Sequence, residues 1–210
     1  MEDRGDVPVK WLRILFYLEV ASIVVSLLGF LPIKKDWITW PSRALTAGVI
    51  YSMFCMGMFH SRYKTAAIFR AVQFSITLIT SLVFIALLKW GVKTDNFEWQ
   101  RPYNTISAIT GSVALVLGWI GTYQLYHAHA DVVAEKSPML EKKWRSFFWV
   151  SLGIGLATSA ASYLLALAYD SLIGNSGVVL STIVNNLPTK IITLICVIYL
   201  HRTIGALEEE

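Results

Sequence analysis

Charged residues are scarce in this chain. Of its 210 residues only 15% are charged, whereas 55% are hydrophobic and the mean hydropathy is +0.56. A soluble domain has about 25% charged residues. The shortage of charge therefore excludes an ordinary soluble domain, and it leaves too few polar residues to coat a separate water-facing module. We interpret residues 1–210 as a single transmembrane domain.

Cysteine is rare, and the signatures of common enzymes are missing. The two cysteines, Cys55 and Cys196, lie far apart in apolar segments, with no disulfide or metal-binding spacing. There is no Walker phosphate loop, no GxSxG, no HExxH and no dinucleotide fingerprint. The sequence therefore favours a protein that is not an enzyme and has no cofactor.

What the chain does contain is six long apolar segments, each bounded by charged residues or tryptophans. A transmembrane helix needs roughly 20 mainly apolar residues, and each segment is close to that length. The sequence predicts an all-α integral membrane protein, built as a bundle of six transmembrane helices in the lipid bilayer. The predicted spans are 11–33, 43–60, 66–90, 104–128, 146–170 and 178–201.

Lysine and arginine predict the orientation. With six spans both termini share one side, and that side has 11 of the 18 Lys and Arg residues, against six on the other. Because cytoplasmic loops carry the excess of positive charge, we expect both termini in the cytoplasm. We expect the membrane to be a plasma membrane or a bacterial inner membrane. Tryptophans near the span edges, including Trp144, predict an aromatic belt at the interfaces.

The net charge of +4 does not indicate nucleic-acid binding. The basic residues are concentrated at the membrane edges, where anionic headgroups lie. The one sizeable cytoplasmic loop, 129–145, ends in a basic, aromatic stretch. We interpret that stretch as an anchor on the membrane surface, and docking of a protein partner is the alternative.

Three ionisable residues fall inside predicted spans: Glu19, Arg70 and Lys190. Such groups are costly in a bilayer and are functional candidates by default. Each belongs to a polar stripe at a spacing of three or four residues, as Gln73 does beside Arg70. Because these faces do not suit lipid, we expect the first, third and sixth spans to converge. The alternative is an ion pair of Glu19 with one of the two bases that only holds the bundle together.

The sixth span carries a further polar signal. Asn185-Asn186-Leu187-Pro188 lies inside the predicted helix, and proline removes one helical hydrogen bond. Freed carbonyls beside two amides resemble the broken helices that line transporter sites, whereas a simple proline kink is the alternative. The predicted ligand site comprises Glu19, Arg70, Gln73, Asn185, Asn186 and Lys190.

Four histidines end predicted spans near the cytoplasmic side: His60, His127, His129 and His201. One interpretation is a metal or haem site shared between helices. We favour a simpler one, in which histidine suits helix C-termini. No carboxylate cluster or haem-attachment motif accompanies the histidines, and the spacing of His127 and His129 does not place both on one helical face. Similar segments around three of these histidines indicate three helical hairpins as one interpretation of the bundle.

Small residues line one side of the fourth and fifth predicted spans, among them Gly118, Gly121 and Gly155. Such faces allow helices to pack closely, against a neighbouring helix or against a second copy of the chain in a homo-oligomer.

These features predict a transport or channel-type protein with an interior site for a small polar or anionic ligand. The first alternative is a non-enzymatic scaffold or regulatory membrane subunit, whose buried charges meet a protein partner or a lipid. The second is a membrane haem or metal redox protein that uses the histidines.

Overall fold

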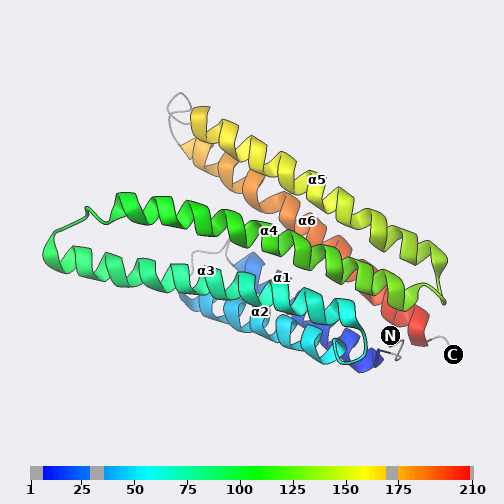
Figure 1. The fold of residues 1–210 in the computed structure, drawn as a ribbon. Helices are drawn as coiled ribbons and strands as arrows, with labels where there is room; N and C mark the ends of the chain where they lie inside the picture. The colour runs from blue at the N-terminus through cyan, green and yellow to red at the C-terminus, as the bar shows by residue number, and fades with distance from the viewer. Residues whose placement is uncertain (1–6, 29–35, 169–174, 209–210) are drawn as a thin grey trace.

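The computed structural model describes residues 7–28, 36–168 and 175–208, and these residues form α-helices joined by short turns (Figure 1). The expectation of an all-helical chain is confirmed. The helices are α1 (Val9–Leu28), α2 (Asp36–Met56), α3 (Ser61–Thr94), α4 (Gln100–Val133), α5 (Pro138–Ala168) and α6 (Asn175–Glu208).

The helices form a closed ring. Each packs on the helix before and after it in the chain, and α6 packs on α1. Successive helices run in opposite directions, so the fold consists of three antiparallel hairpins, with both termini at one end (Figure 1). The α3–α4 and α5–α6 hairpins diverge away from that end, and we call the end with the termini the closed end.

Four helical segments of the described chain are long and apolar enough to cross a membrane: α1, α3, α4 and Pro188–Glu208 of α6. A membrane protein is thus supported by length and composition. α3 and α4 contain 34 residues each, or about 50 Å at 1.5 Å per residue. They exceed the predicted spans 66–90 and 104–128 because both helices continue beyond the apolar segment into charged sequence.

α6 is continuous through Pro188. A helix broken at this point is therefore wrong, and the alternative, a simple proline kink, is compatible with the continuous helix. Proline removes only one backbone donor, and the turns on either side keep their helical hydrogen bonds. The side chains of Asn185 and Asn186 lie outside the described residues.

The α3–α4 turn depends on a glycine and on a residue in the left-handed backbone conformation. A Cβ on Gly91 would lie 2.6 Å from Nε1 of Trp99 and 2.8 Å from the carbonyl oxygen of Asn96. Asp95 adopts φ 51° and ψ 35°, a conformation that Asp and Asn tolerate better than most residues. Its N–H bonds the carbonyl of Gly91 and ends α3. This sequence therefore turns the chain within a few residues.

The α2–α3 and α4–α5 turns lie at the closed end. A Cβ on Gly57 would lie 2.7 Å from Cα of Lys64, so the glycine permits close approach of the two backbones. α5 begins at Pro138, whose missing N–H costs nothing at this position, and Glu141 supplies negative charge to the first turn. Most of the predicted loop 129–145 is consequently helical, which leaves no room for a separate surface stretch.

Most of the buried apolar residues lie at the closed end, and Trp144 is at their centre. Trp144 has no exposed surface, and its Nε1 donates a hydrogen bond to Oγ1 of Thr203, 2.9 Å away. Its ring packs on those of His129, Tyr126 and Tyr199 at centroid distances of 4.6, 5.3 and 5.6 Å. The expectation that Trp144 belongs to an interfacial belt is therefore wrong, because the rotation of α5 directs this side chain inward.

The small-residue faces of α4 and α5 differ in their packing. Gly118 and Gly121 of α4 face α3, as expected for close packing. A Cβ on Gly155 of α5 would meet nothing within 4 Å. The prediction that the α5 face packs closely on a neighbour is thus not met at Gly155, which is partly exposed.

Replacing Trp144 with alanine should destabilise the protein by about 3–5 kcal/mol, the cost of truncating a buried aromatic residue. Trp149 is 64% exposed on the next turn of the same helix, so Trp149→Ala is the matched control and should have a small effect. Thermal unfolding of both variants in detergent measures the difference. Equal losses of stability would contradict the central position of Trp144.

Candidate functional site

A cavity of about 700 Å³ lies next to the buried core, on the side away from the termini. All six helices contribute to its wall. Four of the six predicted site residues line it, and they come from α1, α3 and α6, as the polar stripes predict. The polar or charged lining residues are Glu19, Ser22, Ser26, Ser42, Arg43, Thr46, Arg70, Gln73, Thr77, Trp119, Thr122, Tyr126, Ser151, Thr189, Lys190, Thr193 and Cys196.

Arg70 is held on the cavity wall by two side chains. Its Nη2 donates to Oγ1 of Thr122 at 2.6 Å, and its Nη1 donates to Oε1 of Gln73 at 3.4 Å. Its Nε is buried and has no acceptor. An unsatisfied buried donor costs about 1–3 kcal/mol. The guanidinium is therefore fixed in position, and its buried Nε has no acceptor within the described residues.

Two glycines of α4 make space for this arrangement. A Cβ on Gly118 would lie 2.6 Å from Nε2 of Gln73, and a Cβ on Gly121 would lie 3.2 Å from Cγ of Arg70. The small-residue face of α4 thus accommodates the polar stripe of α3. Thr122, one turn beyond Gly118, is a site residue that the sequence did not reveal, because a lone threonine on an apolar helix gives no specific signal.

Glu19 does not form the predicted ion pair with either base. Among the described residues, no Lys or Arg nitrogen lies within 4.0 Å of its carboxylate, although Arg70 is near enough to act on it electrostatically. Lys190 is half-buried and likewise makes no ion pair within the described chain. The groups face one cavity from different helices without touching.

The cavity has an excess of positive charge. Its described lining has three basic side chains, Arg43, Arg70 and Lys190, and one acidic side chain, Glu19, for a net charge of +2. Arg43 was expected at the outer edge of the second span and not in the site. Its guanidinium lies 5.1 Å from the ring centroid of Trp40.

The four histidines lie toward the closed end, where each makes its own contacts. Nδ1 of His129 lies 2.7 Å from the hydroxyl of Tyr63, and Nδ1 of His127 lies 2.9 Å from the carbonyl of Tyr123. His201 is exposed beside Phe16. The part of the chain that the structure describes contains no group of three or more His, Cys, Asp or Glu residues arranged to hold a metal ion.

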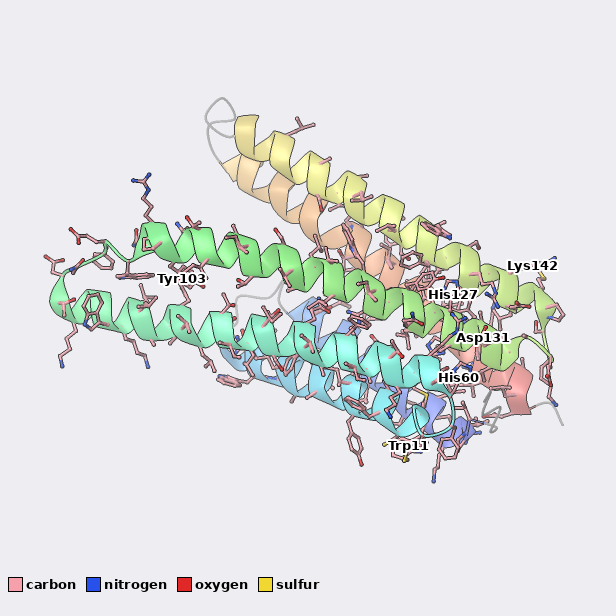
Figure 2. The ribbon with its side chains drawn as sticks, in the orientation of Figure 1. Trp11, His60, Tyr103, His127, Asp131 and Lys142 are labelled. Atoms are coloured by element: carbon pink, nitrogen blue, oxygen red, sulfur yellow. The ribbon has the colours of Figure 1, made fainter. Side chains whose placement is uncertain are left out.

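His60 belongs to an ionic cluster at the closed end that the sequence did not predict. Oδ2 of Asp131 lies 2.9 Å from Nε of Arg62, and Oδ1 lies 3.0 Å from Nη2 of Arg145. Arg145 also bonds Glu141 at 2.9 Å, and Nε2 of His60 lies 3.8 Å from Asp131. Figure 2 shows His60 and Asp131 near each other at the closed end, with Tyr103 toward the opposite end.

Comparison of the chain with protein-family models, with curated proteins and with solved structures finds no match.

Stability should fall in mild acid through His60, which lies in the turn between α2 and α3. Burial lowers the pKa of His60 below 6.5, the nearby Asp131 carboxylate opposes this shift, and Arg62 adds to it. Between the two pKa values the unfolded chain binds more protons than the folded chain, so acid favours unfolding. The His60→Gln variant should lose less stability than wild type as pH falls from about 7.5 to about 5.5.

Melting temperatures across this pH range test the expectation. The exposed His201 supplies the control, since His201→Gln should keep the wild-type pH dependence. Parallel pH profiles for wild type and His60→Gln would contradict a folded-state role for neutral His60.

Proposed function

We propose that the protein crosses the membrane six times, with both termini in the cytoplasm, and binds an anionic ligand in its central cavity as a transport or channel-type protein. The membrane is a plasma membrane or a bacterial inner membrane. The cavity supplies the binding site, and the closed end faces the cytoplasm.

The ring supports six spans. α2 lies between α1 and α3, and α5 lies between α4 and α6. Because α1, α3, α4 and part of α6 are apolar enough to cross a bilayer, a common membrane depth for the helices packed between them is the simplest arrangement. α2 has 21 residues, or about 31 Å at 1.5 Å per residue, which matches the hydrocarbon thickness of about 30 Å.

Charge supports the orientation. The closed end carries the larger group of basic residues, as expected for a cytoplasmic face. The basic residues near this end are Lys10, Arg13, Arg62, Lys64, Lys136, Lys142, Lys143, Arg145 and Arg202.

Fusions to reporter proteins test the orientation. Green fluorescent protein at the C-terminus should fluoresce, and alkaline phosphatase at the same position should be inactive, in a bacterial host. A fusion that ends at Asp95, in the α3–α4 turn, should give active phosphatase instead. The opposite pattern at either position would contradict the proposed orientation.

The main support for anion binding is the environment of the Arg70 guanidinium. Its guanidinium is fixed by Thr122 and Gln73, keeps a buried donor without an acceptor, and faces a cavity with net charge +2. Uncompensated charge at membrane depth is unfavourable. An anion in the cavity would accept from Arg70 and reduce the charge excess, and that gain is a source of binding free energy.

Each predicted residue has a role in this proposal. Arg70 contacts the anion, Gln73 and Thr122 orient the guanidinium, and Lys190 adds positive charge from α6. Glu19 is the counter-ion, and by taking up a proton it would serve as the proton carrier of a coupled transporter. The proposed role of Asn185 and Asn186 is to orient the ligand from α6.

Replacing Arg70 with glutamine should weaken anion binding about 10- to 100-fold, because a hydrogen bond to a charged group contributes about 1.5–3 kcal/mol. Binding is read from the rise in melting temperature of the purified protein with phosphate, sulfate, chloride and carboxylates. Arg101→Gln, at an exposed arginine near the start of α4, is the control and should bind as wild type does.

Two results would contradict a ligand-binding role. One is an Arg70→Gln protein that responds to anions as the wild type does. The other is a wild type that responds to no anion, together with an Arg70→Gln protein that melts far lower; that pair of results would favour a scaffold or regulatory subunit.

A further inference from the structure

The structure assigns a chemical class to the ligand, and this assignment rests on the proposed function. We infer that the ligand is an amphipathic organic anion. Its acid group accepts from Arg70, and its apolar body lies along the wall formed by Phe74, Leu78 and Trp119, on the side of Arg70 away from the termini.

The size of the cavity favours an organic ligand. Its volume is about 700 Å³, whereas one water molecule occupies about 30 Å³ in the liquid. An inorganic anion would fill a small part of this space. Sites for organic ligands measure roughly 300–1,000 Å³, and the cavity falls within that range.

Apolar side chains join the polar ones along α3. After Arg70 and Gln73 the following turns of the lining present Phe74 and Leu78, with one further polar residue, Thr77, between them. α4 adds Trp119, one turn from Thr122. A ligand that binds Arg70 through an acid group therefore meets an aromatic and aliphatic surface beyond it, which requires an apolar body.

The other walls also mix polar and apolar side chains. On α1, Ile23 lies among Glu19, Ser22 and Ser26, and on α6 Ile192 lies between polar lining residues. On α2 the apolar Val49 and Ile50 line the part nearer the closed end, and Ser42, Arg43 and Thr46 line the part farther from it. A fully hydrophilic anion would leave these surfaces against water, whereas an apolar body removes them from water at roughly 25 cal/mol per Å².

Arg70 is a better acid-group partner than Arg43. The Arg43 guanidinium already lies over the Trp40 ring, whereas Arg70 retains an unpaired buried donor. Arg43 and Lys190 therefore attract an entering anion, and Arg70 receives its acid group.

Three related compounds test the class directly on the wild-type protein. 4-Phenylbutyrate has an acid group and an apolar body, 4-phenylbutanamide lacks the charge, and acetate lacks the body. We expect 4-phenylbutyrate to bind at least roughly tenfold more tightly than either of the others, as measured by calorimetric titration of the protein in detergent. Inorganic phosphate is included as a small anion.

Variants then test whether the acid group of the ligand binds Arg70 and whether its apolar body contacts Phe74. Arg70→Gln should weaken 4-phenylbutyrate binding roughly 10- to 100-fold, and Phe74→Ala should weaken it several-fold. Ile79→Ala, at an exposed position on the same helix, is the control and should leave binding unchanged. If Arg70→Gln does not fold, Gly118→Ala displaces the Gln73 amide without removing a charge and should still weaken binding.

The outcomes separate the ligand class from the proposed function. If acetate or phosphate binds as tightly as 4-phenylbutyrate, through Arg70, the anion site stands and the amphipathic class is wrong. If 4-phenylbutanamide binds as tightly as the acid, or if none of the four compounds binds, anion binding itself is overturned together with the class. Unchanged affinity in Phe74→Ala would also overturn the assigned apolar wall.

Discussion

The helices of this protein are held together at one end, around Trp144. At that end nearly every pair of neighbouring helices shares a specific contact: Tyr63 with His129, Asp131 with Arg145, Trp144 with Thr203. Arg13 bonds Glu208 and so joins α1 to α6 at 2.7 Å. The partly exposed ion pairs each contribute little, whereas the buried aromatic core contributes most of the stability. These contacts close the ring of helices at the end with the termini. Beyond this end the α3–α4 and α5–α6 hairpins diverge (Figure 1).

The polar residues inside the bundle depend on that closed ring. Glu19, Arg70 and Lys190 lie on helices that diverge from the core, and each would face lipid if its helix were alone. The ring turns all three toward one cavity, where water or a ligand takes the place of hydrocarbon. Since they do not touch one another, their charges do not cancel by contact. The positive excess of the cavity therefore depends on the packing at the closed end.

The sequence was sufficient for features that depend on helical periodicity. Stripes at a spacing of three and four predicted that Glu19, Arg70, Gln73 and Lys190 share an interior, and they line one cavity. It was insufficient where the outcome depends on how each helix rotates about its axis. Trp144 fits an interfacial tryptophan as well as a buried one by sequence, and only the rotation of α5 decides between them.

Partners distant in the chain were also beyond the reach of the sequence. Asp131 pairs with Arg62 and Arg145 because three helix ends meet at one place, and Thr122 supports Arg70 because α4 packs on α3. Neither contact has a spacing motif. The unbroken course of α6 through Pro188 was not evident either, since the same residues suit a kinked and a broken helix.

We expect the core to close the cavity on the side of the termini and the cavity to be accessible from the opposite side. Cys196 lines the cavity, whereas Cys55 is buried in the core region, so a Cys55→Ala protein carries a single thiol at the cavity floor. The most direct measurement is modification of this thiol in vesicles by a membrane-impermeant, negatively charged thiosulfonate, added to one side at a time. The thiol should be modified from the side opposite the termini and protected from the side of the termini. Modification from the side of the termini, or from neither side, would contradict this expectation.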